Sequence, residues 1–300
     1  MIALLLLLLT VQAQPPRPEA TSLLGKPLVP APIGADTRRT LEENLKKAEI
    51  EYGKNPDDPD ATIWLGRRQA YLGRYREAIE TYSEGIEKHP DDARLYRHRG
   101  HRYITVREFA RAIADFTKAA ELVAGKPDQV EPDGQPNARD IPTSTLQSNI
   151  YYHLGLAHYL SRDYAKAAEA YAKCMIVSKN PDMLVATTYW YYLTLARQRK
   201  TAEAMTLLEP ISAGMDIIEN ASYHRLLRVF KGELTPESLL APGSAGLDTV
   251  TTKHGLAAWH LAAGRKDAAM TLLREIVDGV PQQWPAFGYI AAEADLASKR

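Results

Sequence analysis

The sequence has a single cysteine, Cys174, among 300 residues, and it carries no net charge. One thiol excludes an intramolecular disulfide framework and a thiolate metal cluster. The exact balance of 37 basic and 37 acidic residues argues against a generally basic nucleic-acid binder and against an acidic disordered tail. His98 and His101 share a predicted helix, but no cysteine or adjacent carboxylate completes a metal-ligand set.

Motifs of catalysis are missing as well. The sequence has no Gly-x-Ser-x-Gly, no phosphate-binding Gly-x-x-x-x-Gly-Lys-Ser/Thr and no Gly-x-Gly-x-x-Gly after a predicted strand. Together with the neutral charge, these absences predict no enzyme activity, no cofactor, no metal and no nucleic-acid partner.

The first apolar run, residues 2–11, contains six consecutive leucines but is too short for a membrane-spanning helix. Val11 and Ala13 are small residues at the spacing of a signal-peptidase site, although no Lys or Arg precedes the run. We therefore expect a signal peptide over 1–13 and export to the periplasm or beyond. Without a cysteine at the cleavage point, we expect no lipid anchor. The proline-rich residues 14–36 predict an extended tether.

An internal repeat dominates the rest of the chain. Gly66 and Tyr82 match Gly100 and Phe116 at an offset of 34 residues. The full set of matched positions is Leu65-Gly66, Tyr75, Ala78, Tyr82 and Gly85; Arg99-Gly100, Phe109, Ala112, Phe116 and Ala119; and, in a third copy, Leu154-Gly155, Tyr164, Ala167, Tyr171 and Cys174. A mid-helix glycine costs about 1 kcal/mol against alanine, a cost tolerated where a neighbouring helix must approach closely.

These residues resemble the tetratricopeptide repeat, a 34-residue helix–turn–helix unit. The resemblance implies an all-α fold, a helix–turn–helix solenoid over 37–300 with a C-terminal capping helix at 284–297. The repeats are placed near 59–92, 93–126, 148–181, 185–218 and 250–283. Residues 127–147 interrupt the period with four prolines and four acidic residues. Such a long loop is either functional or disordered, so we expect an arm across one face or a flexible loop.

A narrower resemblance rests on Tyr189-Trp190-Tyr191-Tyr192, followed by Val229-Phe230-Lys231-Gly232-Glu233-Leu234-Thr235 and a final repeat. This order is similar to that of the NlpI-type periplasmic lipoproteins. The similarity implies an often homodimeric scaffold that docks cell-wall hydrolases and a processing protease. The lipidation cysteine and the 127–147 insertion depart from that pattern, and no functional residue is carried over.

A basic stripe marks the second repeat. Arg94, Arg97 and His101 fall on one helix face, and Arg67 is the equivalent of His101 in the first repeat. By analogy with the family, this stripe faces the concave groove, where it suits carboxylates of an acidic peptide, a chain terminus or an anionic wall polymer. Two other readings stay open: the stripe is solvated, or it pairs with the acidic 127–147 insertion. Tyr71, Tyr152 and Tyr159 are expected to add aromatic contact area.

The sequence thus predicts an exported protein-interaction scaffold that binds a peptide or protein, acidic in character, in its concave groove. A homodimer is a further expectation. The alternatives are a binding protein for an anionic glycan or wall polymer and, ranked last, a hydrolase assembled at the insertion.

Overall fold

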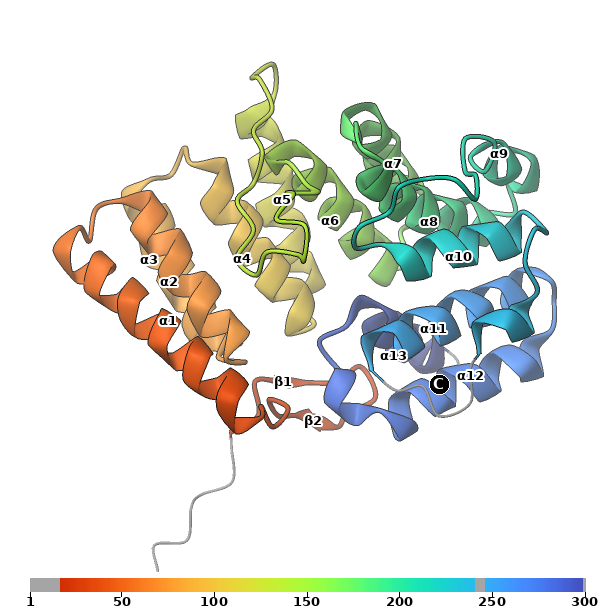
Figure 1. Ribbon diagram of the computed structural model, residues 1–300, viewed down its shortest axis with the longest axis horizontal. Helices are drawn as coiled ribbons and strands as arrows, with labels where there is room; N and C mark the ends of the chain where they lie inside the picture. The colour runs from red at the N-terminus through yellow and green to blue at the C-terminus, as the bar shows by residue number, and fades with distance from the viewer. Residues whose placement is uncertain (1–16, 241–245, 299–300) are drawn as a thin grey trace, which may run out of the picture.

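A computed structural model of the chain describes residues 17–240 and 246–298. The expected signal peptide and its cleavage site after Ala13 lie outside the described residues. Helices dominate the described chain, and they follow one another as antiparallel pairs in an arch (Figure 1), which confirms the all-α solenoid. No helix in the described part is both long and apolar enough to cross a membrane.

The repeat helices form five pairs. They are α2 (Pro59–Tyr71) with α3 (Tyr75–Lys88), α4 (Ala93–Thr105) with α5 (Phe109–Val123), α6 (Leu146–Leu160) with α7 (Tyr164–Val177), α8 (Pro181–Arg197) with α9 (Thr201–Thr206), and α11 (Leu247–Ala262) with α12 (Lys266–Gly279). Helix α1 (Ala35–Lys54) precedes them. Helix α10 (Ala221–Phe230) and the short 3-10 turn η1 (Pro236–Leu239) separate the last two pairs, and η2 (Pro281–Gln283) and α13 (Phe287–Ala297) follow.

Local sequence sets where the first helix begins in four of the five pairs. The side chains of Asp58, Asp92 and Asn180 each accept a hydrogen bond from a backbone N–H of the turn that follows. Thr145 and Ser148 form a reciprocal capping box at the start of α6. These caps satisfy N–H groups that the helix itself leaves unpaired, so α2, α4, α6 and α8 each have a defined first residue.

The repeat glycines lie where the two helices of a pair cross. A Cβ atom built on Gly155 would stand 2.7 Å from two ring carbons of Tyr171, and one on Gly100 would stand 3.0 Å from the Phe116 ring. Tyr171 and Phe116 are completely buried. The matched glycine and aromatic positions of the repeat are therefore direct contacts, which explains why they recur together.

This contact predicts opposite outcomes for two glycine-to-alanine changes. Gly155→Ala is expected to destabilise the protein by about 1–3 kcal/mol, because the buried Tyr171 ring has nowhere to move. Gly53→Ala, on an open face of α1 with nothing within 4 Å, is expected to stabilise it by up to ~1 kcal/mol. Urea unfolding of both variants measures the difference, and equal effects in the two would contradict the proposed crossing contact.

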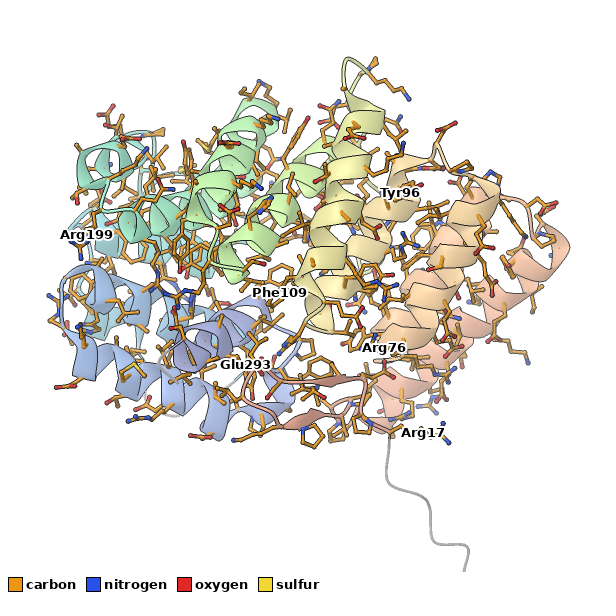
Figure 2. All side chains as sticks on the ribbon, turned by 180° about the vertical axis from the view of Figure 1, so that it is seen from behind. Arg17, Arg76, Tyr96, Phe109, Arg199 and Glu293 are labelled. Carbon is orange, nitrogen blue, oxygen red and sulfur yellow. The ribbon has the colours of Figure 1, made fainter. Side chains whose placement is uncertain are left out.

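The first described residues correct one prediction. Residues 17–34 do not form an extended tether: β1 (Ala20–Thr21) and β2 (Pro27–Leu28) pair as an antiparallel hairpin. Glu19 accepts a hydrogen bond from the backbone of Arg76 on α3 at 2.8 Å, and at the far end of the chain the Trp284 indole donates to the carbonyl of Val29 at 2.6 Å. The hairpin thus joins the first repeat to the last helices. Figure 2 labels Arg76 and Glu293, which lie near its two ends.

Helix α13 packs on α11 and α12, as expected of a capping helix, and also turns back onto earlier repeats. Its Glu293 forms an ion pair with Arg107 at 3.0 Å, and both side chains are almost completely buried, 0% and 3% exposed. Arg107 also donates to the carbonyl of Trp284 at 2.8 Å. The C-terminal helix therefore contacts the α4–α5 turn, some 180 residues away in sequence.

Candidate functional site: the inner face of the first three repeats

A segment between α5 and α6, residues 127–145, crosses the inner face of the arch and is called the strap here. Figure 1 shows it as the yellow-green trace that runs over α4. Its two ends are held together: Val130 and Thr145 form a β-bridge, and the Thr145 hydroxyl donates to Asp128 at 2.6 Å. The expected arm across one face is therefore present as an ordered loop with closely spaced ends.

Glu131 of the strap is the carboxylate that reaches deepest into the inner face. Its Oε1 lies 2.9 Å from a guanidinium nitrogen of Arg97, and its Oε2 accepts from the Asn149 amide at 3.0 Å. The Arg97 and Glu131 side chains are only 10% and 11% exposed. Burial lowers the pKa of Arg97, and the Glu131 charge opposes that shift. Each buried charge of this pair is thus stabilised by the opposite charge of its partner.

The first repeat holds the strap backbone. Arg67 donates to the carbonyl of Pro132 at 2.8 Å, and Arg68 donates to that of Gly134 at 2.9 Å. Both guanidinium groups also lie over the Trp64 ring, 4.6 and 4.9 Å from its centroid. A Cβ atom on Gly134 would overlap the Tyr71 hydroxyl, so a larger residue at this position would displace the Tyr71 side chain from the strap. The half-buried Tyr71 therefore packs on the strap.

Arg94 lies at the rim of this face. It forms ion pairs with Asp92, at 2.6 Å, and with Asp60. The hydrogen bonds that Arg94 donates to the Asp92 carboxylate are the main cause of the raised pKa of Arg94. Of the open readings of the basic stripe, the geometry places Arg94 and Arg97 in pairs with carboxylates of the same chain. Both guanidinium groups therefore already have a carboxylate partner within the chain.

His101 joins a cluster of rings behind the strap. Its ring centroid lies 4.5 Å from that of His153 and 5.5 Å from that of Phe287. Burial, together with the charge of Arg102, holds the pKa of His101 well below its usual value. The imidazole is therefore neutral at pH 7 and is not a cationic anchor for a carboxylate.

The two remaining tyrosines are buried. Tyr152 lies against Phe287 and Tyr171, and Tyr159 packs edge-on against Trp190 and Tyr164. Only 7% and 4% of these residues is exposed, so neither offers a broad aromatic surface on the open inner face, although Tyr152 borders a pocket beside Phe287. The expectation that they line an open groove fails because α13 and α8 cover them, and the local sequence does not reveal these neighbours.

Sequence reasoning missed Glu131 and Asn149 as residues of this face. The acidic composition of the insertion pointed to pairing with the stripe, but it did not single out Glu131 among the insertion's four acidic residues. Within residues 17–240 and 246–298, no group of three or more His, Cys, Asp or Glu side chains is placed to hold a metal ion.

Comparison with known proteins identifies the repeats. The tetratricopeptide repeat family matches residues 65–129 and again residues 148–178. Tetratricopeptide repeat protein 12 of Mus musculus is 25% identical over 134 residues, which cover 45% of this chain and 16% of the mouse protein. Tetratricopeptide repeat protein 13 of Homo sapiens is 36% identical over 72 residues, covering 24% of this chain and 8% of the human protein. The chain thus spans less than a fifth of these curated relatives.

A solved structure extends the similarity to the whole arch. A tetratricopeptide repeat protein from Parabacteroides merdae superposes with a TM-score of 0.50 at 13% identity, covering 86% of this chain and 94% of that one. At this identity the likeness concerns the fold alone. None of these three proteins bears on the NlpI-type resemblance, which stays a prediction.

Proposed function

We propose, from the premise that this chain is a tetratricopeptide-repeat protein, that it is a protein-interaction scaffold that holds an extended acidic segment of a partner on its inner face. The observation that carries the proposal is the strap itself. Arg67 and Arg68 bind its backbone carbonyls, and Arg97 binds its carboxylate. The same donors suit any extended segment with a glutamate at the position of Glu131.

In this proposal the strap occupies the site until a partner replaces it. Only the residues near Glu131 have to leave, because the β-bridge between Val130 and Thr145 fixes the ends of the loop. A cavity of about 210 Å³ beside Glu131, lined by Trp64, Arg67 and Arg94 among others, leaves space for a side chain of an incoming segment. The leucine-rich residues 1–13 support the further proposal that the scaffold acts outside the cytoplasm.

The proposal that a partner's carboxylate replaces Glu131 at Arg97 can be tested with a peptide of the strap's own sequence, residues 127–136. Glu131→Gln removes the internal charge and is expected to raise affinity for this peptide about tenfold, since Arg97 then lacks a carboxylate. Isothermal titration calorimetry measures the dissociation constants of the variant and of the unaltered protein.

Two further variants complete this experiment. Adding Arg97→Gln to Glu131→Gln is expected to abolish the gain. Asp140→Asn is the matched control, because Asp140 is an exposed strap residue that forms no ion pair with any residue in the described ranges. If Glu131→Gln and Asp140→Asn bind the peptide equally, the exchange at Arg97 is refuted.

A further inference from the structure

A second cavity, of about 350 Å³, lies where α4, α6, α10, α11 and α13 meet. His101, Tyr152, Tyr223 and Phe287 contribute rings to its wall, and Glu219 and Asp248 contribute carboxylates. No lysine or arginine belongs to the lining among the residues that the structure describes. Its volume is that of pockets that take small molecules or single side chains.

The aromatic part of the wall is built from distant parts of the chain. Phe287 lies 5.5 Å from His101 and 6.4 Å from Tyr152 between ring centroids. The His101 ring nitrogens have no hydrogen-bond partner within the described chain, although the ring is largely enclosed. The imidazole is uncharged, so it does not repel a cation and can offer it a nitrogen lone pair or a ring face.

The carboxylates of this region lack cationic partners. Across the described residues, no ion pair involves Asp248, Glu219 or the nearby strap residue Asp133. Asp248 accepts a hydrogen bond from the Ser222 hydroxyl at 2.8 Å, and Glu219 accepts from Thr143 and Asn137. Burial, and then the charge of Glu219, raise the pKa of Asp133, as expected for carboxylates that face one another.

Three helices, α10, α11 and α13, begin at the cavity, and their N-termini favour negative charge. Each N-terminus is equivalent to about half a positive charge, so the three together offset at most about one and a half charges. The exposed Arg225 donates to Ser222 at 3.4 Å and does not line the cavity. Glu219 and Asp248, the two carboxylates of the lining, carry more negative charge than this offset, and no cationic side chain of the described residues lines the cavity.

We propose that this cavity binds an organic cation, either the ammonium group of a partner's lysine side chain or a small free quaternary ammonium ion. Aromatic faces attract such a cation through their quadrupoles, and carboxylates add charge-assisted hydrogen bonds. The site is separate from the strap contacts at Arg97 and does not depend on their exchange. Its proposed ligand is positively charged, whereas the partner segment that the basic stripe suggests is negatively charged.

The test uses two cationic probes, Nα-acetyl-lysine amide and tetramethylammonium, and one neutral analogue, Nα-acetyl-norleucine amide. Ligand-observed NMR titration gives the dissociation constants. We expect at least one cation to bind and the neutral analogue not to bind. Binding of the lysine amide alone identifies a side chain of a partner as the source, whereas binding of tetramethylammonium alone identifies a small free quaternary ammonium ion.

Matched variants locate the bound probe. Asp248→Asn keeps the shape of an exposed residue and is expected to weaken cation binding roughly tenfold. Asp267→Asn is the control, because Asp267 also lies exposed in the first turn of a helix, α12, away from the cavity. Phe287→Leu, which removes a ring and keeps an apolar side chain, is expected to weaken tetramethylammonium binding as well.

Three outcomes would overturn the proposal. The first is that neither cation binds, and the second is that the norleucine analogue binds as well as the lysine amide. The third is that Asp248→Asn and Asp267→Asn have equal effects. Each of these leaves the strap experiment unaffected, because that experiment reads the affinity of an acidic peptide at Arg97.

Discussion

Replacing Glu293 by alanine is expected to lower the free energy of unfolding by about 3–5 kcal/mol, the usual cost of breaking a buried ion pair. The carboxylate is fully buried and lies 3.0 Å from Arg107, whose side chain is 3% exposed. Removal of one partner leaves the other charge buried without compensation. Glu293 also accepts from the backbone N–H of Leu23, so the same change loosens the hairpin. Chemical denaturation followed by circular dichroism measures the loss.

Two further variants show how much of the stability loss comes from leaving a buried charge unpaired. Arg107→Met combined with Glu293→Leu is expected to cost less than Glu293→Ala alone, since no unpaired charge remains. Glu203→Ala breaks the exposed pair between Glu203 and Lys200 and is expected to cost no more than about 1 kcal/mol. A loss at Glu293 as small as that at Glu203 would show that the pair does not hold the two ends of the chain together.

Acidification from pH 7 to pH 5 is expected to destabilise the protein through its buried histidines. Burial is the main cause that lowers the pKa of His153 to about 3 and that of His254 to about 3. In the unfolded chain a histidine has a pKa of about 6.5, so the unfolded state binds more protons throughout this range. Their contribution to stability is complete above pH 6.5 and is lost as the pH falls toward 3.

For each of these two histidines the expected slope is about 0.7 kcal/mol per pH unit at pH 6.5 and approaches about 1.4 kcal/mol per pH unit near pH 5. Urea titrations at several pH values between 5 and 7 give the slope directly. His153→Phe places a non-titrating ring beside Phe116 and Phe287 and is expected to reduce it. A midpoint that stays constant from pH 7 to pH 5 would mean that these imidazoles are not neutral and buried in the folded state.

The repeat architecture could be predicted because its signal is local and repeated. Gly66, Gly100 and Gly155 each contact the aromatic residue 16 positions later, so the spacing in the sequence directly reports the helix crossing. Such contacts lie within one helical pair and do not depend on the rest of the fold.

Contacts between distant segments could not be predicted in this way. Residues 17–34 predict a tether because prolines interrupt any period, yet Val29 receives its hydrogen bond from Trp284, 255 positions later. Likewise, the sequence identifies the basic stripe but not its neutralisation, since Arg97 meets Glu131 only after the strap has folded back. Positive φ angles at Gly73, Arg107, Arg162, Arg199 and Gly264 mark the same turn in each of the five described helical pairs. Nothing local shows that Arg107, alone among them, binds Glu293.

The hairpin of residues 17–34 also imposes an order on folding during synthesis. Its strands leave the ribosome before any repeat, but Trp284 and Glu293, which bind Val29 and Leu23 of the hairpin, are added 255 and 270 residues later. Neighbouring helical pairs of a solenoid can assemble as they emerge, because each pair packs mainly on the next. The arch can close only after the last helix has been made, so the earliest residues of the described chain are among the last to reach their final contacts.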